Sequence, residues 1–253
     1  MVVTGASRGI GLAIATHALS RGARVGLIAR SSEDLGRAAE TLRTPGGPAV
    51  AVASGDVGDR KQIESALDSI QSQIGPVDVL VNNAGTGAFG PFGTVPLVDL
   101  EHALRVNYLG TVYATNAVLP AMQDRRSGHI VNIASVAGRV ATPGETAYSA
   151  TKFAIVGFTQ CLAMELKPTG IGVSMVLPGP VDTDAYLAPD EDYVRGFPPR
   201  VSADRVALAT LKAIELRRLE VVVPSWFRVV ALLQAAFSGA IAKLPARVFD
   251  HED

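Results

Sequence analysis

A tyrosine and a lysine, Tyr148 and Lys152, stand four residues apart in the sequence. On a helix this spacing places both side chains on one face, with the ammonium beside the phenol. A phenol has an ordinary pKa of about 10, so acid–base work near neutrality needs about 4 kcal/mol of extra stabilisation of the phenolate. A nearby positive charge acts in that direction. The pair is therefore a candidate proton-transfer device, although an aromatic residue and a lysine on an ordinary amphipathic helix would share the same spacing.

Short, almost wholly apolar runs alternate with helical patterns along the chain, and such runs are typical of parallel strands that are buried on both faces and joined by right-handed crossovers. We expect strands at residues 1–4, 24–29, 49–53, 77–81, 129–133, 172–177 and 220–223. We expect helices at residues 9–20, 32–42, 59–74, 97–123, 146–167 and 202–216. No linker or repeat interrupts this alternation. The sequence therefore predicts a Rossmann-like, doubly wound α/β fold, with a seven-stranded parallel sheet flanked by helices, in one domain over residues 1–253.

The amino-acid composition excludes several classes of partner and of site. Of the 253 residues, 48% are hydrophobic and 19% are charged, and the formal net charge is -1, which describes a folded globular protein and argues against a nucleic-acid partner. Cys161 is the only cysteine, and the histidines lack metal-ligand spacing, so we expect neither a disulfide nor a metal site. No signal-peptide pattern opens the sequence, and we expect a cytoplasmic protein.

A glycine-rich turn follows the first expected strand, with glycines at positions 5, 9 and 11 where a helix should begin. Glycines there permit positive φ angles and let backbone N–H groups approach a pyrophosphate at the positive end of the helix. The spacing is Gly-x-x-x-Gly-x-Gly and differs from the Gly-x-Gly-x-x-Gly form. Its place between a strand and a helix predicts a dinucleotide-binding loop.

The end of the second expected strand bears on the choice of cofactor. NAD-binding sites of this topology commonly carry an acid there, which binds the ribose 2'-hydroxyl. This sequence has Arg30 instead, and Arg8 in the glycine loop is a second guanidinium. Arginines favour a 2'-phosphate, so we expect NADP(H) rather than NAD(H). The alternative is that Arg30 pairs with Asp34 and that Arg8 is simply exposed.

Several motifs in order carry a resemblance to a known family: the glycine loop, Asn82-Asn-Ala-Gly85 after a strand, then Ser135, then Tyr148 and Lys152. Together they resemble the short-chain dehydrogenase/reductase family, in its single-domain branch, over residues 1–223. The resemblance implies a Rossmann-type fold that transfers hydride between a nicotinamide and a carbonyl or secondary alcohol carbon. The first strand is shorter than the family usually has, and a start site assigned too late and a naturally short strand both stay open.

The resemblance also implies roles for four catalytic residues. Tyr148 would exchange a proton with the substrate oxygen, and Lys152 would lower the pKa of Tyr148 and hold the nicotinamide ribose. Ser135 would donate a hydrogen bond to the same oxygen, where negative charge develops. Asn107 would kink the helix expected at residues 97–123 and support a water relay to the lysine. A helix-interior asparagine bonded to local backbone is the alternative for Asn107.

Further positions match cofactor contacts of the family. Asp56 resembles the residue that bonds the adenine amino group, Asn82 the one that stabilises the central sheet beside the cofactor, and Thr183 the one that binds the nicotinamide carboxamide. Each could instead be a turn former. The expected cofactor-binding set is Gly5, Ser7, Arg8, Gly9, Ile10, Gly11, Arg30, Asp56, Val57, Asn82, Ala84, Gly85, Tyr148, Lys152, Pro178, Gly179, Val181 and Thr183.

The substrate side is expected to be apolar. Between Ser135 and Tyr148, little charge is offered to a pocket by Val136, Val140, Ala141, Thr142 and Pro143, which favours a lipophilic carbonyl or alcohol substrate. Residues 185–194 match the substrate-covering region, and the acids Asp190, Glu191 and Asp192 within it are expected to be a solvated surface. The alternative to an oxidoreductase is a catalytically silent regulatory or scaffolding protein, which would keep the fold and bind the nucleotide without turnover.

The tail, residues 224–253, predicts an additional helix. Its apolar stripe consists of Trp226, Val229, Val230, Leu233, Phe237, Ile241 and Leu244. We expect this helix to pack on its own domain and wall the substrate pocket; a subunit contact and peripheral membrane attachment, helped by Arg228, Lys243 and Arg247, are the alternatives. The resemblance also implies a homodimer or homotetramer, formed through the helix at 146–167, which presents Phe153, Val156, Phe158 and Leu162.

Overall fold

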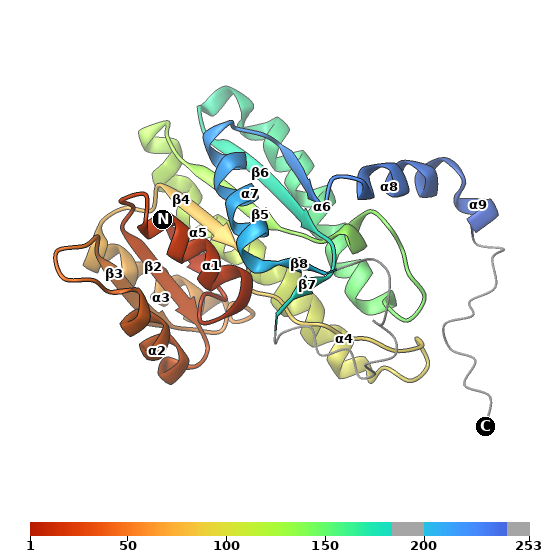
Figure 1. Cartoon of the computed structure of the whole chain (residues 1–253), viewed down its shortest axis with the longest axis horizontal. Coiled ribbons are helices and arrows are strands. Elements are labelled where there is room, and N and C mark those ends of the chain that lie inside the picture. The colour runs from red at the N-terminus through yellow and green to blue at the C-terminus, as the bar shows by residue number, and fades with distance from the viewer. Residues whose placement is uncertain (184–199, 242–253) are drawn as a thin grey trace.

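The computed structural model describes residues 1–183 and 200–241. Its centre is a seven-stranded sheet in the order β3-β2-β1-β4-β5-β6-β9, in which every neighbouring pair is parallel (Figure 1). The strands are β1 Val2–Thr4, β2 Val25–Ala29, β3 Val50–Ser54, β4 Val79–Asn82, β5 His129–Ile133, β6 Gly172–Pro178 and β9 Glu220–Val223. The predicted doubly wound fold and its seven parallel strands are confirmed. Two short strands that were not predicted, β7 Val181–Asp182 and β8 Val201–Ser202, pair with each other.

Helices cover both faces of the sheet, and strand residues alternate between the two cores. Val3, Leu27 and Val131 face one core, whereas their neighbours Val2, Ile28 and Ile130 face the other. The first core is closed by α1 Gly9–Leu19, α2 Ser32–Leu42 and α7 Ala203–Glu215. The second is closed by α3 Arg60–Ile74, α5 Gly110–Arg125 and α6 Thr146–Leu166. Burial on both faces explains why the strand sequences are almost continuously apolar.

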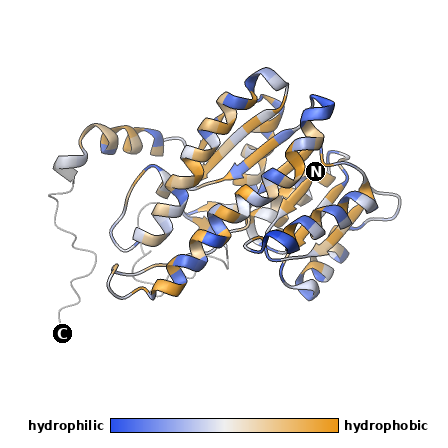
Figure 2. Ribbon diagram, turned by 180° about the vertical axis from the view of Figure 1, so that it is seen from behind, coloured by the Kyte–Doolittle hydropathy of each residue, from blue (hydrophilic) through white to orange (hydrophobic). Residues whose placement is uncertain are grey.

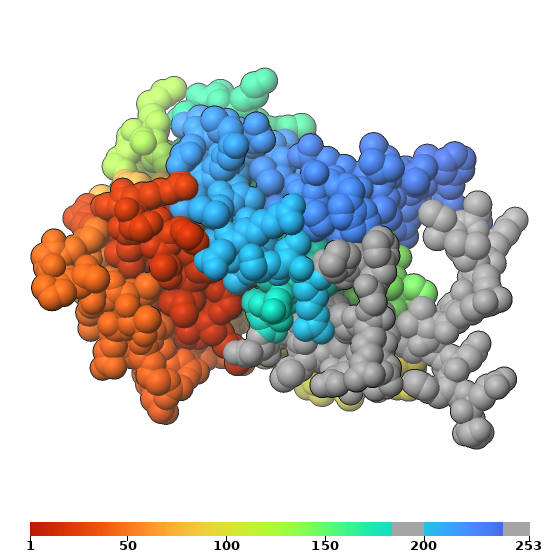
Figure 3. Space-filling view, in the orientation of Figure 1, coloured from red at the N-terminus to blue at the C-terminus, as the bar shows by residue number. Residues whose placement is uncertain are grey.

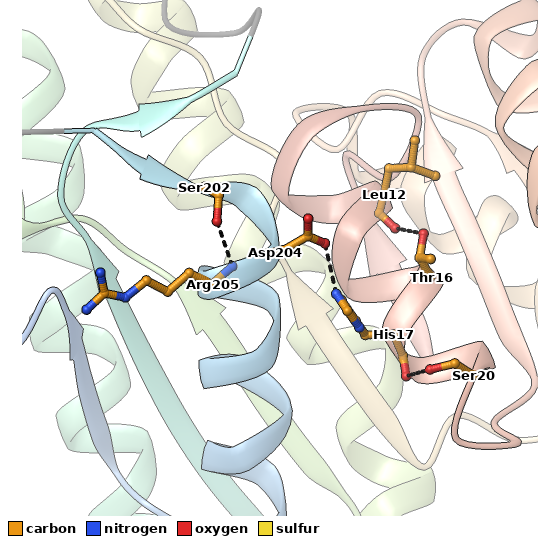
Figure 4. Close-up of polar contacts among 7 residues, drawn as sticks. All are labelled: Leu12, Thr16, His17, Ser20, Ser202, Asp204 and Arg205. Carbon is orange, nitrogen blue, oxygen red and sulfur yellow. Dashed lines mark hydrogen bonds and ion pairs between the residues drawn. The ribbon is translucent and has the colours of Figure 1, made fainter.

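The helices α1 and α7 lie side by side across the first face, which brings residues far apart in the sequence together (Figures 1 and 3). Ser202 caps α7, because its hydroxyl accepts a hydrogen bond from the backbone N–H of Arg205. In the same first turn of α7, the carboxylate of Asp204 lies 2.8 Å from Nε2 of His17 on α1 (Figure 4). These contacts fix the helix that begins at the glycine loop against the C-terminal half of the chain.

The helix predicted at residues 97–123 consists of three segments. The α-helix α4 Leu97–Ala103 leads into a π-helix, η1 Leu104–Leu109, and α5 follows directly. Single π turns inside helices are uncommon and often occur at functional sites. Asn107 lies within η1, so the sequence-based expectation of a distortion at this residue agrees with the backbone. Short 3₁₀ turns, η2 Val136–Gly138 and η3 Lys167–Thr169, flank α6.

The C-terminal helices α8 Phe227–Ala236 and α9 Ser238–Ile241 extend away from the sheet (Figures 1 and 2). Val230, from the predicted stripe, packs against the domain together with Phe227. Gln234, which is not part of the stripe, donates a hydrogen bond to the carbonyl of Ala141 at 3.0 Å. Four other residues of the stripe are exposed, Trp226, Val229, Leu233 and Phe237, and so is Leu232. The expected packing of this helix on its own domain is therefore found only in part, and among the described residues its side chains do not line the cleft. The ends of the tail, with Lys243, Leu244 and Arg247, lie outside those residues.

Two further expectations about surfaces can be compared with the structure. On α6, Phe153 is exposed, but Val156 and Leu162 are buried against the sheet side, so only part of the expected apolar surface is available to another subunit. None of the helices in the described ranges is long and apolar enough to cross a membrane. Residues 185–194, with the acids Asp190, Glu191 and Asp192, lie outside the described residues.

Candidate active site

A cleft with a cavity volume of about 400 Å³ opens at the carboxyl ends of the strands. Its walls come from the loops that follow six strands of the sheet, on both sides of the β1–β4 junction, where the strand order reverses direction. Open α/β sheets bind ligands at this position. The predicted site residues that line the cleft are Gly5, Ser7, Arg8, Gly9, Ile10, Arg30, Asp56, Val57, Ala84, Gly85, Ser135, Tyr148, Lys152, Pro178, Gly179, Val181 and Thr183.

The glycine loop lies against the loop after β4, and the close approach explains its glycines. Gly5 has φ 63°, and a Cβ there would come within 2.8 Å of the Cα of Ala84. Thr4 fixes the contact, since its hydroxyl accepts hydrogen bonds from the backbone N–H groups of Asn83 and Ala84 at 3.0 and 3.1 Å. Gly11 packs beside the side-chain amide of Asn83 and does not line the cleft. Its role in the structure is packing rather than ligand contact.

The loop presents the N-terminal end of α1 to the cleft, and no side chain caps that end of the helix. Gly9, the first residue of α1, has φ 57°, and a Cβ there would come within 3.3 Å of Thr183. Free N–H groups at a helix N-terminus and the helix dipole together favour anionic groups such as phosphates. This cradle, which a side chain would fill, fits the pyrophosphate of a dinucleotide.

Charged groups surround the end of the cleft beyond β2. Arg30 and Arg8 line it and are both exposed. Asp34 lines the same end, and in the described part of the chain its ion pair is with Arg37 rather than with Arg30. Asp56 follows β3, and its carboxylate accepts a hydrogen bond from the N–H of Gly58 at 2.8 Å. The alternative pairing of Arg30 with Asp34 is therefore not formed, and the guanidinium of Arg30 is available to a ligand.

Tyr148 and Lys152 lie on α6 and face the cleft together. Nζ of Lys152 is 5.5 Å from the centre of the Tyr148 ring and donates a hydrogen bond to the carbonyl of Ile133 at 3.2 Å. Only 4% of Lys152 is exposed, and this burial lowers the pKa of its ammonium to about 8. At neutral pH the lysine is still mostly protonated, so it supplies the positive charge that favours a phenolate at Tyr148.

Ser135 follows β5 on the opposite wall. Its hydroxyl accepts a hydrogen bond from the N–H of Ala137 at 3.1 Å and donates to the carbonyl of Pro178 at 3.5 Å. The second contact is long for a hydroxyl donor. The proton of Ser135 is therefore weakly held and can turn to an oxygen that enters the cleft.

Asn107 and Asn82, both predicted as site residues, do not line the cleft. Asn107 is buried behind its wall, where its side chain bonds to both backbone groups of Thr86 and to the hydroxyl of Thr151. Asn82 is buried under the sheet, where its amide donates to Thr115 and to Asn132. These bonds between β4, β5 and α5 agree with the expected role of Asn82 in stabilising the central sheet, while its side chain points away from the cleft.

Other residues line the cleft that sequence reasoning did not select. They include Asn83, Thr86, Phe89, His102 and Glu145. Phe89 packs on Tyr148 with ring centres 5.3 Å apart. Asn83 and Thr86 directly follow a predicted strand, so their position at the carboxyl edge could have indicated them. Glu145 stands three residues before Tyr148, and the helical spacing was the available signal.

Comparison with known proteins agrees with this geometry. The family model described as short chain dehydrogenase matches residues 1–192 of the chain. The chain belongs to the short-chain dehydrogenase/reductase family, whose members are nicotinamide-dependent oxidoreductases, and the resemblance predicted from the motifs is confirmed.

Among curated relatives, a 3-dehydrosphinganine reductase of Danio rerio is 40% identical over 190 residues, which are 74% of this chain and 57% of the relative. A 3-ketodihydrosphingosine reductase of Mus musculus is 37% identical over 82% of this chain and 63% of the relative. The ketoacyl reductase HetN of a Nostoc strain is 33% identical over 88% of this chain and 77% of the relative. The chain thus spans less than two thirds of the length of the first two.

Solved structures with this fold hold nicotinamide cofactors of both kinds. A short-chain dehydrogenase/reductase of Burkholderia phymatum in complex with NAD superposes with a TM-score of 0.85 at 28% identity, covering 96% of this chain and 95% of that one. An actinorhodin polyketide ketoreductase with NADPH has a TM-score of 0.78 at 33% identity, covering 87% of this chain and 94% of that one. These likenesses support a nicotinamide cofactor in the cleft and leave the choice between NAD and NADP to the residues of this chain.

Proposed function

We propose that this chain is an NADP(H)-dependent oxidoreductase that interconverts a carbonyl and a secondary alcohol of a lipophilic substrate. The observation that carries the proposal is that Tyr148, Lys152 and Ser135 line the same cleft as the glycine loop. A bound nicotinamide supplies or accepts the hydride. The residues of the chain then have to hold the substrate oxygen and move one proton.

In the proposed mechanism the phenol of Tyr148 gives its proton to the carbonyl oxygen during reduction and takes it back during oxidation. The ammonium of Lys152, 5.5 Å from the ring centre, lowers the cost of the phenolate and holds the nicotinamide ribose. Ser135 donates a hydrogen bond to the same oxygen while negative charge develops on it. Asn107 acts at a distance, by holding the loop at Thr86 and the hydroxyl of Thr151 behind the tyrosine.

The preference for NADP(H) is supported by the two arginines at the far end of the cleft. Arg30 takes the place at the end of β2 where an acid would bind a ribose 2'-hydroxyl. Arg8 lines the same cleft from the glycine loop. Two guanidinium groups favour the doubly charged 2'-phosphate, whereas Asp34, engaged with Arg37, offers the weaker competing charge. Asp56 and Thr183 are proposed to contact the adenine and the carboxamide.

A lipophilic substrate is supported by the walls near Tyr148 and by the relatives. Phe89 packs on Tyr148, and Val106 and Val136 also line the cleft. The relatives named 3-dehydrosphinganine reductase and ketoacyl reductase are, by their names, reductases of carbonyl compounds. Together these observations favour a ketone with a long apolar part as the substrate of this chain.

We further propose that the whole chain is one domain that works as a homodimer or homotetramer in the cytoplasm. The exposed Phe153 on α6 supports a subunit contact there. Attachment of α8 to a membrane surface is the alternative use of its exposed apolar side chains, since Val229, Leu232 and Phe237 face solvent.

The competing function is a nucleotide-binding scaffold without turnover. The test is to scan long-chain ketones with NADPH, following NADPH fluorescence, in the wild type and in Tyr148→Phe. We expect the variant to keep NADPH affinity within about threefold and to lose turnover by at least about 100-fold, because general acid–base catalysis contributes that much or more. Binding without turnover by the wild type over the whole scan would favour the scaffold.

A further inference from the structure

Glu145 occupies a position in the cleft that the proton-transfer residues do not use. It is the N-cap residue of α6, and its carbonyl accepts the first helical hydrogen bond, from Ser149 at 2.7 Å. Tyr148 is therefore one helical turn further on, and residues with this spacing have Cβ atoms about 5–6 Å apart on the same face. Both side chains line the cleft. A substrate whose carbonyl reaches Tyr148 thus carries its neighbouring atoms past the carboxyl group of Glu145.

The backbone around Glu145 is fixed from two sides. The preceding residue, Gly144, has φ 78°, and its carbonyl accepts a hydrogen bond from the N–H of Gly90 at 2.8 Å. The backbone N–H of Glu145 donates to the carbonyl of Thr142 at 3.2 Å. This turn joins the loop after β4, which carries Phe89, to the start of α6. The carboxyl group is therefore presented to the cleft from a rigid support and not from a free loop.

The side chain of Glu145 does not serve the helix that it begins. It makes no capping hydrogen bond to the first turn of α6, and the ion pairs in the described ranges do not include it. Within residues 1–183 and 200–241, the titratable side chains that line this part of the cleft with it are His102 from α4, and Tyr148 and Lys152 from α6. Lys152 is turned to the carbonyl of Ile133.

Burial raises the pKa of Glu145 to about 7. The rise has desolvation as its cause, and among the residues that the structure describes no ion pair gives the carboxylate a positive partner. A ligand cation would supply one and would also replace the water that the carboxylate loses when an apolar chain fills the cleft. A neutral ligand would bring no such charge and would favour the protonated form of Glu145.

We propose that Glu145 is a specificity-determining residue that binds a protonated amine of the substrate, carried within a few bonds of the carbonyl that Tyr148 protonates. The inference rests on the proposed function and names its substrate class: a lipophilic amino ketone, or the amino alcohol in the reverse direction. Hydride and proton go to the carbonyl carbon and oxygen as before, and the amine keeps its protons throughout. The carboxylate binds and orients the substrate and takes no part in bond making.

The test compares two long-chain ketones of equal length, one with an amino group on the carbon beside the carbonyl and one with a methyl group there. The proteins are the wild type, Glu145→Gln, Glu145→Asp and the control Glu165→Gln, which removes an exposed acid from the same helix. At about pH 7.5 we expect Glu145→Gln to raise KM for the amino ketone by about 10- to 100-fold, the loss typical of a charged hydrogen bond. KM for the methyl ketone should change by less than about threefold. Glu145→Asp should restore part of the preference for the amino ketone over the methyl ketone.

Binding without turnover separates this inference from the proposed function. Titration calorimetry of the amino alcohol into the NADP-loaded Tyr148→Phe protein, with and without Glu145→Gln, needs no catalysis. Because Glu145 ionises when it pairs with the ammonium, binding at about pH 6.5 should release protons from the protein with Glu145 and not from the Gln variant. The inference would be overturned if Glu145→Gln raised KM equally for both ketones, or if the amino alcohol bound equally well with and without Glu145. Either result would count against it even if the wild type reduces the methyl ketone. Amine binding that depends on Glu145 in a protein that reduces neither ketone would support the inference and sink the proposed function.

Discussion

Asn107 holds Thr86 by both of its backbone groups. Oδ1 of Asn107 accepts a hydrogen bond from the N–H of Thr86 at 2.8 Å, and Nδ2 donates to the carbonyl of Thr86 at 2.9 Å. The same Nδ2 donates to the hydroxyl of Thr151, which in turn donates to the carbonyl of Tyr148. One fully buried side chain in the π-helix η1 thus connects the loop after β4 with the helix that carries the catalytic pair.

This relationship predicts the effect of Asn107→Asp. The carboxylate cannot donate to the carbonyl of Thr86 or to Thr151, so buried acceptors would face each other and the free energy of unfolding should fall by about 1–3 kcal/mol. We also expect kcat to fall by at least about tenfold with a smaller change in the dissociation constant of NADPH. The measurements are a thermal melt and steady-state kinetics. Asn116→Asp, an exposed change on α5, is the control, and a melt no lower than that of the control would contradict the argument.

The pKa of Lys152 predicts a pH limit on the enzyme. Burial lowers this pKa to about 8, so the ammonium loses its proton, and the tyrosine loses its positive neighbour, as the pH rises through that value. The kcat/KM for the cofactor, which reports the free enzyme, should therefore decline above about pH 8. A rate profile from about pH 6 to 10 checks this. A profile that stays level to the alkaline end would show that the lysine is protonated throughout.

The raised pKa of Glu145 predicts that Glu145→Gln stabilises the protein at high pH but not at low pH. The pKa of Glu145 is raised from 4.5 to about 7 in the folded protein, so the folded state binds this proton more tightly than the unfolded state does. The contribution of this proton to the free energy of unfolding is fully present below about pH 4.5 and is lost as the pH rises through about 7. Gln has no charge to bury. We expect Glu145→Gln to melt like the wild type at about pH 4.5 and at a higher temperature at about pH 8, with the difference growing between these values. A difference that is the same at both pH values would contradict the burial of an ionisable carboxyl group.

Arg30 predicts the cofactor preference. Arg30→Asp removes a cation from the end of β2 and places an acid where NAD-binding sites have one. Affinity for NADPH should fall by at least about tenfold, the loss of one charge-assisted pair, while affinity for NADH stays the same or rises. Fluorescence titration with both cofactors measures this. An equal loss for the two would mean that Arg30 does not contact the 2'-phosphate.

The sequence predicted the sheet well because burial on both faces leaves a strong pattern. All seven strands were expected, and so was the position of Tyr148 and Lys152 on one face of a helix at the edge of the cleft. The expected role of Asn82 in stabilising the sheet agrees with its hydrogen bonds, but the direction of its side chain could not be predicted, because a polar residue at the end of a buried strand can point to either side of the sheet. Its partner Asn132 lies on another strand and is adjacent only in the folded protein.

Other features depend on tertiary contacts that local patterns do not record. The expected helix at residues 97–123 has the composition of a continuous helix, and its π turn follows from bonds that Asn107 makes to distant loops. In the sequence, Glu145 is an ordinary polar residue at the start of an expected helix. Only the folded structure shows that it lines the cleft. The stripe of α8 has the period of a packed helix, yet no other element covers most of it among the described residues.

The hydrogen bond between Gln234 and the carbonyl of Ala141 ties the projecting helix to the turn that precedes Glu145 and Tyr148. The last described helices are therefore in direct contact with the segment that leads into α6, and a change in the position of α8 would act on the turn that precedes Tyr148.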